Sequence, residues 1–132
     1  MSNYFEMNLD LIQPSQLYIS EKKLANIQKQ FDSNKTNTPG VIPIKMLDNE
    51  IIFTDGHTRA FVAYLAGFKT IKVEWETEEL DWEMYQICVQ WCKDEEIFTI
   101  ADLVSRVIDH HEYEILWYKR CKTMLQELIE KE

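Results

Sequence analysis

The hydrophobic and polar positions of the chain follow two different periods. Between residues 9 and 76, short apolar runs and polar residues alternate in the way that is typical of strands, interrupted by two helical stretches. From residue 81 onward, apolar residues recur every three or four positions, as they do on one face of a helix. The pattern predicts an α+β fold, with a small mixed sheet and packed helices followed by a helical C-terminal half.

Strands are expected at residues 9–12, 41–47, 50–54 and 71–75. Asp48-Asn49 predicts a tight hairpin between the second and third of these, because Asn and Asp tolerate left-handed backbone conformations. Ser20 and Asp81 each predict the start of a helix as its N-cap, and Thr99 to Asp102 resembles a capping box. Residues 32–40, which are rich in polar residues and end in Pro-Gly, predict a loop.

A polar cluster lies where a predicted strand gives way to a predicted helix. The apolar run 51–53 is followed by apolar positions 61, 64, 65 and 68 at helical spacing, so the period changes across Asp55-Gly56. Gly56 allows a tight turn, Asp55 or Thr58 can cap the helix, and the first helical N–H groups favour an anion. Arg59 in the first turn could bind the same anion through two hydrogen bonds.

The same residues also fit a simpler interpretation. A helix start needs a cap, and Asp-Gly is ordinary turn chemistry, so this stretch could be only a well-made turn. His57 and Arg59 favour the ligand site, because a cation in the first turn opposes the helix dipole unless an anion lies between them.

The stretch from Asp55 to Ala60, Asp-Gly-His-Thr-Arg-Ala, resembles the signature of the ParB/sulfiredoxin-like superfamily, in which Gly-x-x-Arg opens a helix after a strand and contributes to a phosphate site. Ile12-Gln13-Pro14 resembles the Ile-x-Pro opening of ParB N-terminal domains, and the Gly-Val-Ile-Pro-Ile run at residues 40–44 resembles the strand that follows. The resemblance implies a core at residues 1–78. Residues 79–132 are then a helical C-terminal extension packed on or beside this core.

Departures from the family pattern narrow the function. His57 occupies the position of the sulfiredoxin catalytic cysteine, so reductase activity is not expected. Leu17 and Tyr18 stand where ParB proteins carry an arginine, and His57-Thr58 replaces part of their Gly-Glu-Arg-Arg motif, so chromosome-site binding and a CTP switch are not expected either. By motif, the stretch is most similar to the free-serine kinases of this fold, which use an Asp-Gly-His-x-Arg element and a glutamate base.

Two hypotheses follow, from different functional classes. The first is binding of a nucleotide or another phosphorylated small molecule, with ATP or ADP and Mg²⁺ as cofactors, in a small-molecule (amino-acid) phosphotransferase. Its catalytic candidates are Asp55, His57 and Glu21, and its cofactor-binding candidates are Gly56, His57, Thr58 and Arg59. The second is a non-catalytic ParB-like interaction or regulatory module, whose Trp-rich helical half binds a protein partner or forms a homodimer. A nuclease is the third and least favoured hypothesis, because the acidic residues lack the fixed spacing that a two-metal site needs.

Charge and chain composition exclude several classes. The net charge is -9, and residues 74–96 alone carry -8, since they contain one basic and nine acidic residues. Duplex DNA is not an expected partner, because phosphate binding needs a clustered basic face.

No apolar run approaches 18 residues, so no membrane span is expected. Three cysteines without a disulfide pattern predict reduced thiols and a cytoplasmic protein.

A metal site is not predicted either. Cys88 and Cys92 are four residues apart and would share a helical face, with Cys121, His110 and His111 as further potential ligands. However, Cys88 lies in an apolar stripe, and the chain has no loop with a Cys-x-x-Cys pair, so buried free cysteine is the simpler interpretation.

Overall fold

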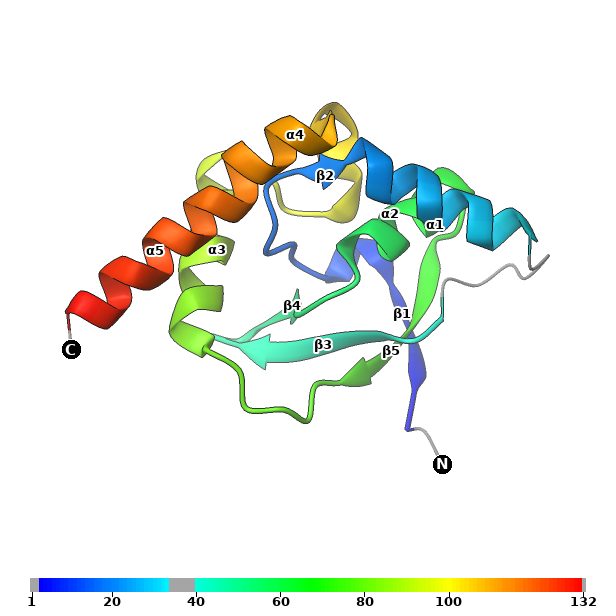
Figure 1. Ribbon diagram of the computed structural model, residues 1–132. Coiled ribbons are helices and arrows are strands. Elements are labelled where there is room, and N and C mark those ends of the chain that lie inside the picture. Colours follow the sequence, from blue (N-terminus) through cyan, green and yellow to red (C-terminus); the bar gives the residue numbers. More distant parts are fainter. Residues whose placement is uncertain (1–2, 34–39, 132) are drawn as a thin grey trace.

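A computed structural model describes residues 3–33 and 40–131 of the chain (Figure 1). It shows a four-stranded mixed sheet, a two-stranded sheet, and helices gathered on one side of the larger sheet. The α+β class with a helical C-terminal half is confirmed. In chain order the elements are β1 (Phe5–Asn8), the 3₁₀ helix η1 (Leu9–Leu11), β2 (Ile19–Ser20), α1 (Glu21–Ser33), β3 (Ile42–Leu47), β4 (Glu50–Phe53), α2 (His57–Leu65), β5 (Thr70–Trp75), α3 (Trp82–Asp94), the 3₁₀ helix η2 (Ile100–Ser105), β6 (Val107–Ile108), α4 (His110–Tyr113), the π-helical segment η3 (Glu114–Tyr118) and α5 (Lys119–Glu130).

The larger sheet has the order β1-β5-β3-β4. β5 is antiparallel to β1 and parallel to β3, and β4 returns antiparallel beside β3. Asp48 and Asn49 form the turn between β3 and β4 with φ angles of 52° and 66°, so the predicted hairpin is confirmed.

One hydrophobic core joins the sheet to the helices. Ile42 and Ile44 of β3 are fully buried, and the intervening Pro43 is half-buried, as expected for a strand with one face inward. The same cluster of buried side chains includes Tyr113 and Trp117 from the C-terminal helices. These helices therefore complete the core over the sheet.

Two features of the sheets differ from the sequence prediction. The strand predicted at residues 9–12 is wrong, because the first strand is β1 and the chain then turns into η1. The bond from Leu9 N–H to the carbonyl of Lys69, at 2.9 Å, is the last contact in line with the β1–β5 pairing before the chain turns. The parallel pair β2–β6 was not predicted, since two residues a strand are too few for a periodic pattern.

The helix starts agree better with the sequence. Ser20 Oγ accepts a hydrogen bond from Lys23 N–H at 3.3 Å, Asp81 Oδ1 accepts one from Met84 N–H at 3.1 Å, and Thr99 begins a capping box. The loop predicted at 32–40 begins later than expected, after α1, and residues 34–39 lie outside the described part. In the described ranges, no helix has both the length and the apolar character needed to cross a membrane.

Candidate functional site

The polar cluster lies at the strand-to-helix junction, as the period change predicted. β4 ends at Phe53, and Gly56 at φ 78° is the residue from which α2 begins. Neither Asp55 nor Thr58 caps α2 with its side chain, so that prediction is wrong. Instead, the exposed Asp55 carboxylate accepts a hydrogen bond from Gly56 N–H at 2.7 Å, which stabilises the turn before the helix.

The first helical turn presents backbone donors. The first hydrogen bond of α2 runs from Ala60 N–H to the carbonyl of Gly56 at 2.9 Å. The amides of His57 and Thr58 precede it, so they have no acceptor within the helix. With the positive end of the helix dipole behind them, these amides favour an anionic ligand.

His57 connects this turn to the N-terminal segment. Gln13 pairs with Ile52 at the edge of β4, and this pairing brings Ser15 to the junction. There Ser15 N–H donates to His57 Nε2 at 2.9 Å, and Ser15 Oγ donates to the carbonyl of Phe53 at 2.8 Å. The imidazole is therefore fixed by a backbone group 42 residues away in the chain.

Burial keeps the His57 ring neutral. The side chain is 5% exposed, and loss of hydration lowers its pKa from 6.5 to about 4, although the nearby Asp55 carboxylate acts in the opposite direction. Because Nε2 accepts a hydrogen bond, the proton of the neutral ring is assigned to Nδ1. At neutral pH, His57 can thus offer an N–H donor, whereas its Nε2 lone pair is already engaged.

Arg59 folds back over the turn. Its Nη1 donates to the carbonyl of Val41 at 3.3 Å, and a Cβ placed on Gly56 would lie 2.9 Å from its Nη2. Glycine is favoured at position 56 by its positive φ, and a Cβ there would also lie 3.1 Å from Cγ2 of Ile42. Arg59 supports the segment before β3 in addition to bringing a cation to the junction.

Helix α3 also contacts the turn between β4 and α2. Tyr85 Oη donates to the carbonyl of Thr54 at 2.7 Å, and Thr54 Oγ1 donates to Glu76 Oε1 at 2.9 Å. Burial, followed by the charges of Asp55 and Glu76, raises the pKa of Tyr85 to about 12, so the phenol stays protonated and keeps donating.

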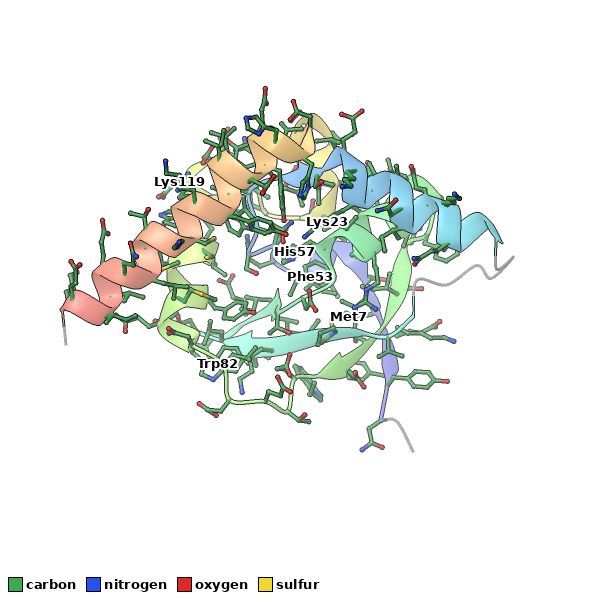
Figure 2. The ribbon with its side chains drawn as sticks, in the orientation of Figure 1. Met7, Lys23, Phe53, His57, Trp82 and Lys119 are labelled. Atoms are coloured by element: carbon green, nitrogen blue, oxygen red, sulfur yellow. The ribbon has the colours of Figure 1, made fainter. Side chains whose placement is uncertain are left out.

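A cavity of about 340 Å³ opens at the start of α2. All five residues from Asp55 to Arg59 line it. Figure 2 shows the labelled Lys23 and His57 in the space between the helices and the larger sheet, and both belong to the lining. The other described residues of the lining are Gln16, Asn26, Ile27 and Tyr113.

The structure thus groups most of the candidate residues but not all of them. Glu21 is exposed in the first turn of α1 and is not part of the lining. Lys23, which sequence reasoning missed, does line the cavity. Its spacing to Asn26 and Ile27 is i, i+3 and i+4, the one signal that could have placed these three on one face of a helix.

The cysteines and histidines of the C-terminal half do not gather into a metal site. Cys88 and Cys92 are buried in the core, and His110 Nδ1 is hydrogen-bonded with Ser20 Oγ at 2.9 Å. Over residues 3–33 and 40–131, no group of three or more His, Cys, Asp or Glu side chains could hold a metal ion.

Comparison with known proteins adds information on the fold. No family model matches the chain, and no curated protein matches it. The solved structure of protein Atu1540 from Agrobacterium tumefaciens is similar, with a TM-score of 0.53 at 12% sequence identity. The similarity covers 81% of this chain and 62% of that one, so the chain spans less than two thirds of its structural neighbour. At this identity the likeness describes the fold alone.

Proposed function

We propose that the protein binds a nucleotide or another phosphorylated small molecule in the cavity at the start of α2. The phosphate lies against the amides of His57 and Thr58, with Arg59 as its cationic partner. In this proposal the chain is a ParB/sulfiredoxin-like protein, as the motif resemblance implies, and its three free cysteines fit a cytoplasmic protein.

The observation that carries the proposal is that residues 55–59 of the motif all line one cavity. The volume of about 340 Å³ falls in the range of small-molecule sites. Among the described residues that line it, Lys23 and Arg59 are the cations and Asp55 is the carboxylate, in a chain whose net charge is -9. A locally positive cavity in an acidic protein selects anions.

Phosphotransfer is an extension of this proposal. Transfer of a phosphoryl group from ATP or ADP to a hydroxyl needs Mg²⁺ and an acceptor for the hydroxyl proton. Asp55 is the carboxylate in the lining, so it is the residue we propose for metal ligation or proton transfer. Its neighbour His57 would donate from Nδ1, because its pKa of about 4 leaves it neutral. Glu21 lies outside the lining and would need to reach the substrate from the first turn of α1.

The alternative of a Trp-based interaction surface has less support. Trp117 is 7% exposed, and its ring meets the half-buried Trp91 edge to face, with centroids 6.2 Å apart. Arg120 covers Trp91 at 4.1 Å, and Lys45 covers Trp82 at 4.7 Å. The tryptophans of the helical half are largely engaged within the molecule, which leaves the cavity as the better candidate site.

Thermal unfolding with ATP, ADP, CTP, GTP and free amino acids, each with Mg²⁺, tests the proposal. A true ligand at 100 times its dissociation constant stabilises the fold by about 2.7 kcal/mol, which raises Tm by roughly 10 °C for a chain of this length. Arg59→Ala is expected to lose most of this shift, because a charge-assisted contact contributes about 1.5 to 3 kcal/mol.

The shift must be measured against the ligand-free Tm of each variant. Loss of the bond to the Val41 carbonyl should lower the ligand-free stability of Arg59→Ala by about 1 kcal/mol. Arg120→Ala removes the same charge outside the cavity and should keep the full shift. The absence of a shift with every nucleotide would favour the non-catalytic module, and an unchanged shift in Arg59→Ala would show that the ligand binds elsewhere.

A further inference from the structure

Two tyrosines hold Lys23 at the wall of the cavity. Its Nζ lies 5.2 Å from the ring centroid of Tyr113 and 4.9 Å from that of Tyr118, and it donates a hydrogen bond to the Tyr118 hydroxyl. A lysine on a helix surface normally samples many rotamers. Here the aromatic faces and the hydroxyl define where the ammonium lies.

The π-helical segment η3 makes this arrangement possible. Tyr113 and Tyr118 are five residues apart, and an α-helix would point such residues about 140° away from each other. A π turn, with its i to i+5 spacing, brings them onto one side. Their rings accordingly meet edge to face, with centroids 4.9 Å apart. Single π turns are frequent at functional sites.

The tyrosine beneath Lys23 is itself fixed. Gln16 Nε2 donates to Tyr113 Oη at 3.0 Å and to the carbonyl of Tyr18 at 2.8 Å. Tyr113 is 1% exposed, so its ring serves as wall and is not free to stack on a ligand. Because the ammonium is already positioned, less side-chain entropy is lost when it binds an anion.

Lys23 comes from a different helix than the motif. Arg59 and the first amides of α2 can serve one phosphate, while Lys23 lines the cavity from α1. Among the described residues of the lining, the cations are Lys23 and Arg59 and the carboxylate is Asp55. Lys23 therefore offers an anion a contact in addition to the donors at the start of α2.

We propose that Lys23 is a second anion-binding residue of this cavity, so that the ligand carries two anionic groups. One is the phosphate at the start of α2, and the other is a phosphate or carboxylate beside Lys23. This inference rests on the proposed function, because it assumes that a phosphate occupies the cavity. The inference specifies the class of ligand, which is a diphosphate or a phosphorylated carboxylate. It also specifies Lys23 as the residue that selects for this class.

Titration calorimetry with three probes tests this inference. Inorganic phosphate carries one anionic group, pyrophosphate a second phosphate, and 2-phosphoglycolate a carboxylate. The wild type should bind pyrophosphate or 2-phosphoglycolate at least about tenfold more tightly than phosphate, the effect expected of one further charge-assisted contact. The better of the two probes identifies the second group.

Lys23→Met should lose this preference and keep its affinity for phosphate. Lys22→Met is the matched control, because Lys22 is the exposed neighbour outside the lining and its loss changes the net charge equally. It should keep the preference. Lys23→Arg retains the positive charge and should keep most of the preference, which separates the charge at this position from the packing of the side chain.

The failures of the two proposals are distinguishable. If the wild type binds phosphate and Arg59→Ala does not, while Lys23→Met keeps the preference for a two-anion probe, the role of Lys23 is refuted and the proposed function stands. The role of Lys23 is also refuted if the wild type shows no preference for a two-anion probe over phosphate. It is refuted as well if Lys22→Met and Lys23→Met lose this preference equally. If the wild type binds none of the three probes, the proposed function fails, and the role of Lys23 fails with it.

Discussion

At the scale of single residues, His57 shows that the properties of a motif residue depend on residues far away in the sequence. From its place after Gly56 we predicted a catalytic or ligand-binding histidine, and the residue does line the cavity. Its burial and its bond to Ser15 N–H could not be predicted, because Ser15 approaches only when the segment at Gln13 pairs with β4. A strand-to-helix turn can be recognised from its own residues, but the protonation state of its histidine depends on the tertiary fold.

The low pKa of His57 predicts a pH dependence of stability. The ring has a pKa of about 4 in the folded protein and 6.5 as its ordinary value, so below pH 6.5 the unfolded chain binds a proton that the folded one excludes. The contribution to stability is fully present above pH 6.5 and is lost as pH falls toward 4. Between pH 7 and pH 5, the free energy of unfolding should fall by about 2 kcal/mol from this group alone.

Urea denaturation of His57→Gln at the two pH values measures this effect. The glutamine oxygen can still accept from Ser15 N–H, but it does not titrate, so the variant should lose about 2 kcal/mol less than the wild type. His111→Gln, at an exposed position, should behave like the wild type. An equal pH dependence in all three proteins would mean that His57 is not buried in its neutral form.

At the scale of elements, the strand-turn-helix junction and the caps at Ser20 and Asp81 were predictable, whereas the cap of α2 and the short elements were not. The β3–β4 hairpin, α2 and the cap at Asp81 each follow from a local signal of a few residues. The pair β2–β6 and the segment η3 carry no such signal, because a two-residue strand has no period and a π turn arises from packing. The position of the Lys23 ammonium against Tyr113 and Tyr118 depends on this second kind of element, because the π turn brings the two rings together.

The two glycines that flank α2 allow its first turn to be tested. Both have positive φ, 78° at Gly56 and 91° at Gly67, so alanine at either costs about 1 to 2 kcal/mol of backbone strain. A Cβ at Gly56 would also lie 3.1 Å from Cγ2 of Ile42, whereas nothing lies within 4 Å at Gly67. Gly56→Ala should therefore be less stable than Gly67→Ala by about 1 kcal/mol or more in urea denaturation. Equal losses would mean that the turn has room for a side chain.

At the scale of the whole molecule, the acidic stretch at residues 74–96 contributes no residue to the described lining of the cavity. Residues 74–96 carry -8 and contribute Glu76 and Tyr85, which hold the turn from outside the lining. The sequence-based expectation that duplex DNA does not bind stays a prediction, and it rests on this charge. The C-terminal helices share one core with the sheet and bring Tyr113 to the cavity, so the site is completed by both halves of the chain.

The most direct test of the proposed anion site is a titration of the ¹⁵N-labelled protein with pyrophosphate, followed through its backbone amide resonances. We expect saturable shifts that are largest at His57 and Thr58, whose amides face no helical acceptor, together with smaller shifts around Lys23. Gly67, at the far end of the same helix, should not move. Shifts spread over the surface lysines and arginines, or none at residues 56–59, would contradict an anion site at the start of α2.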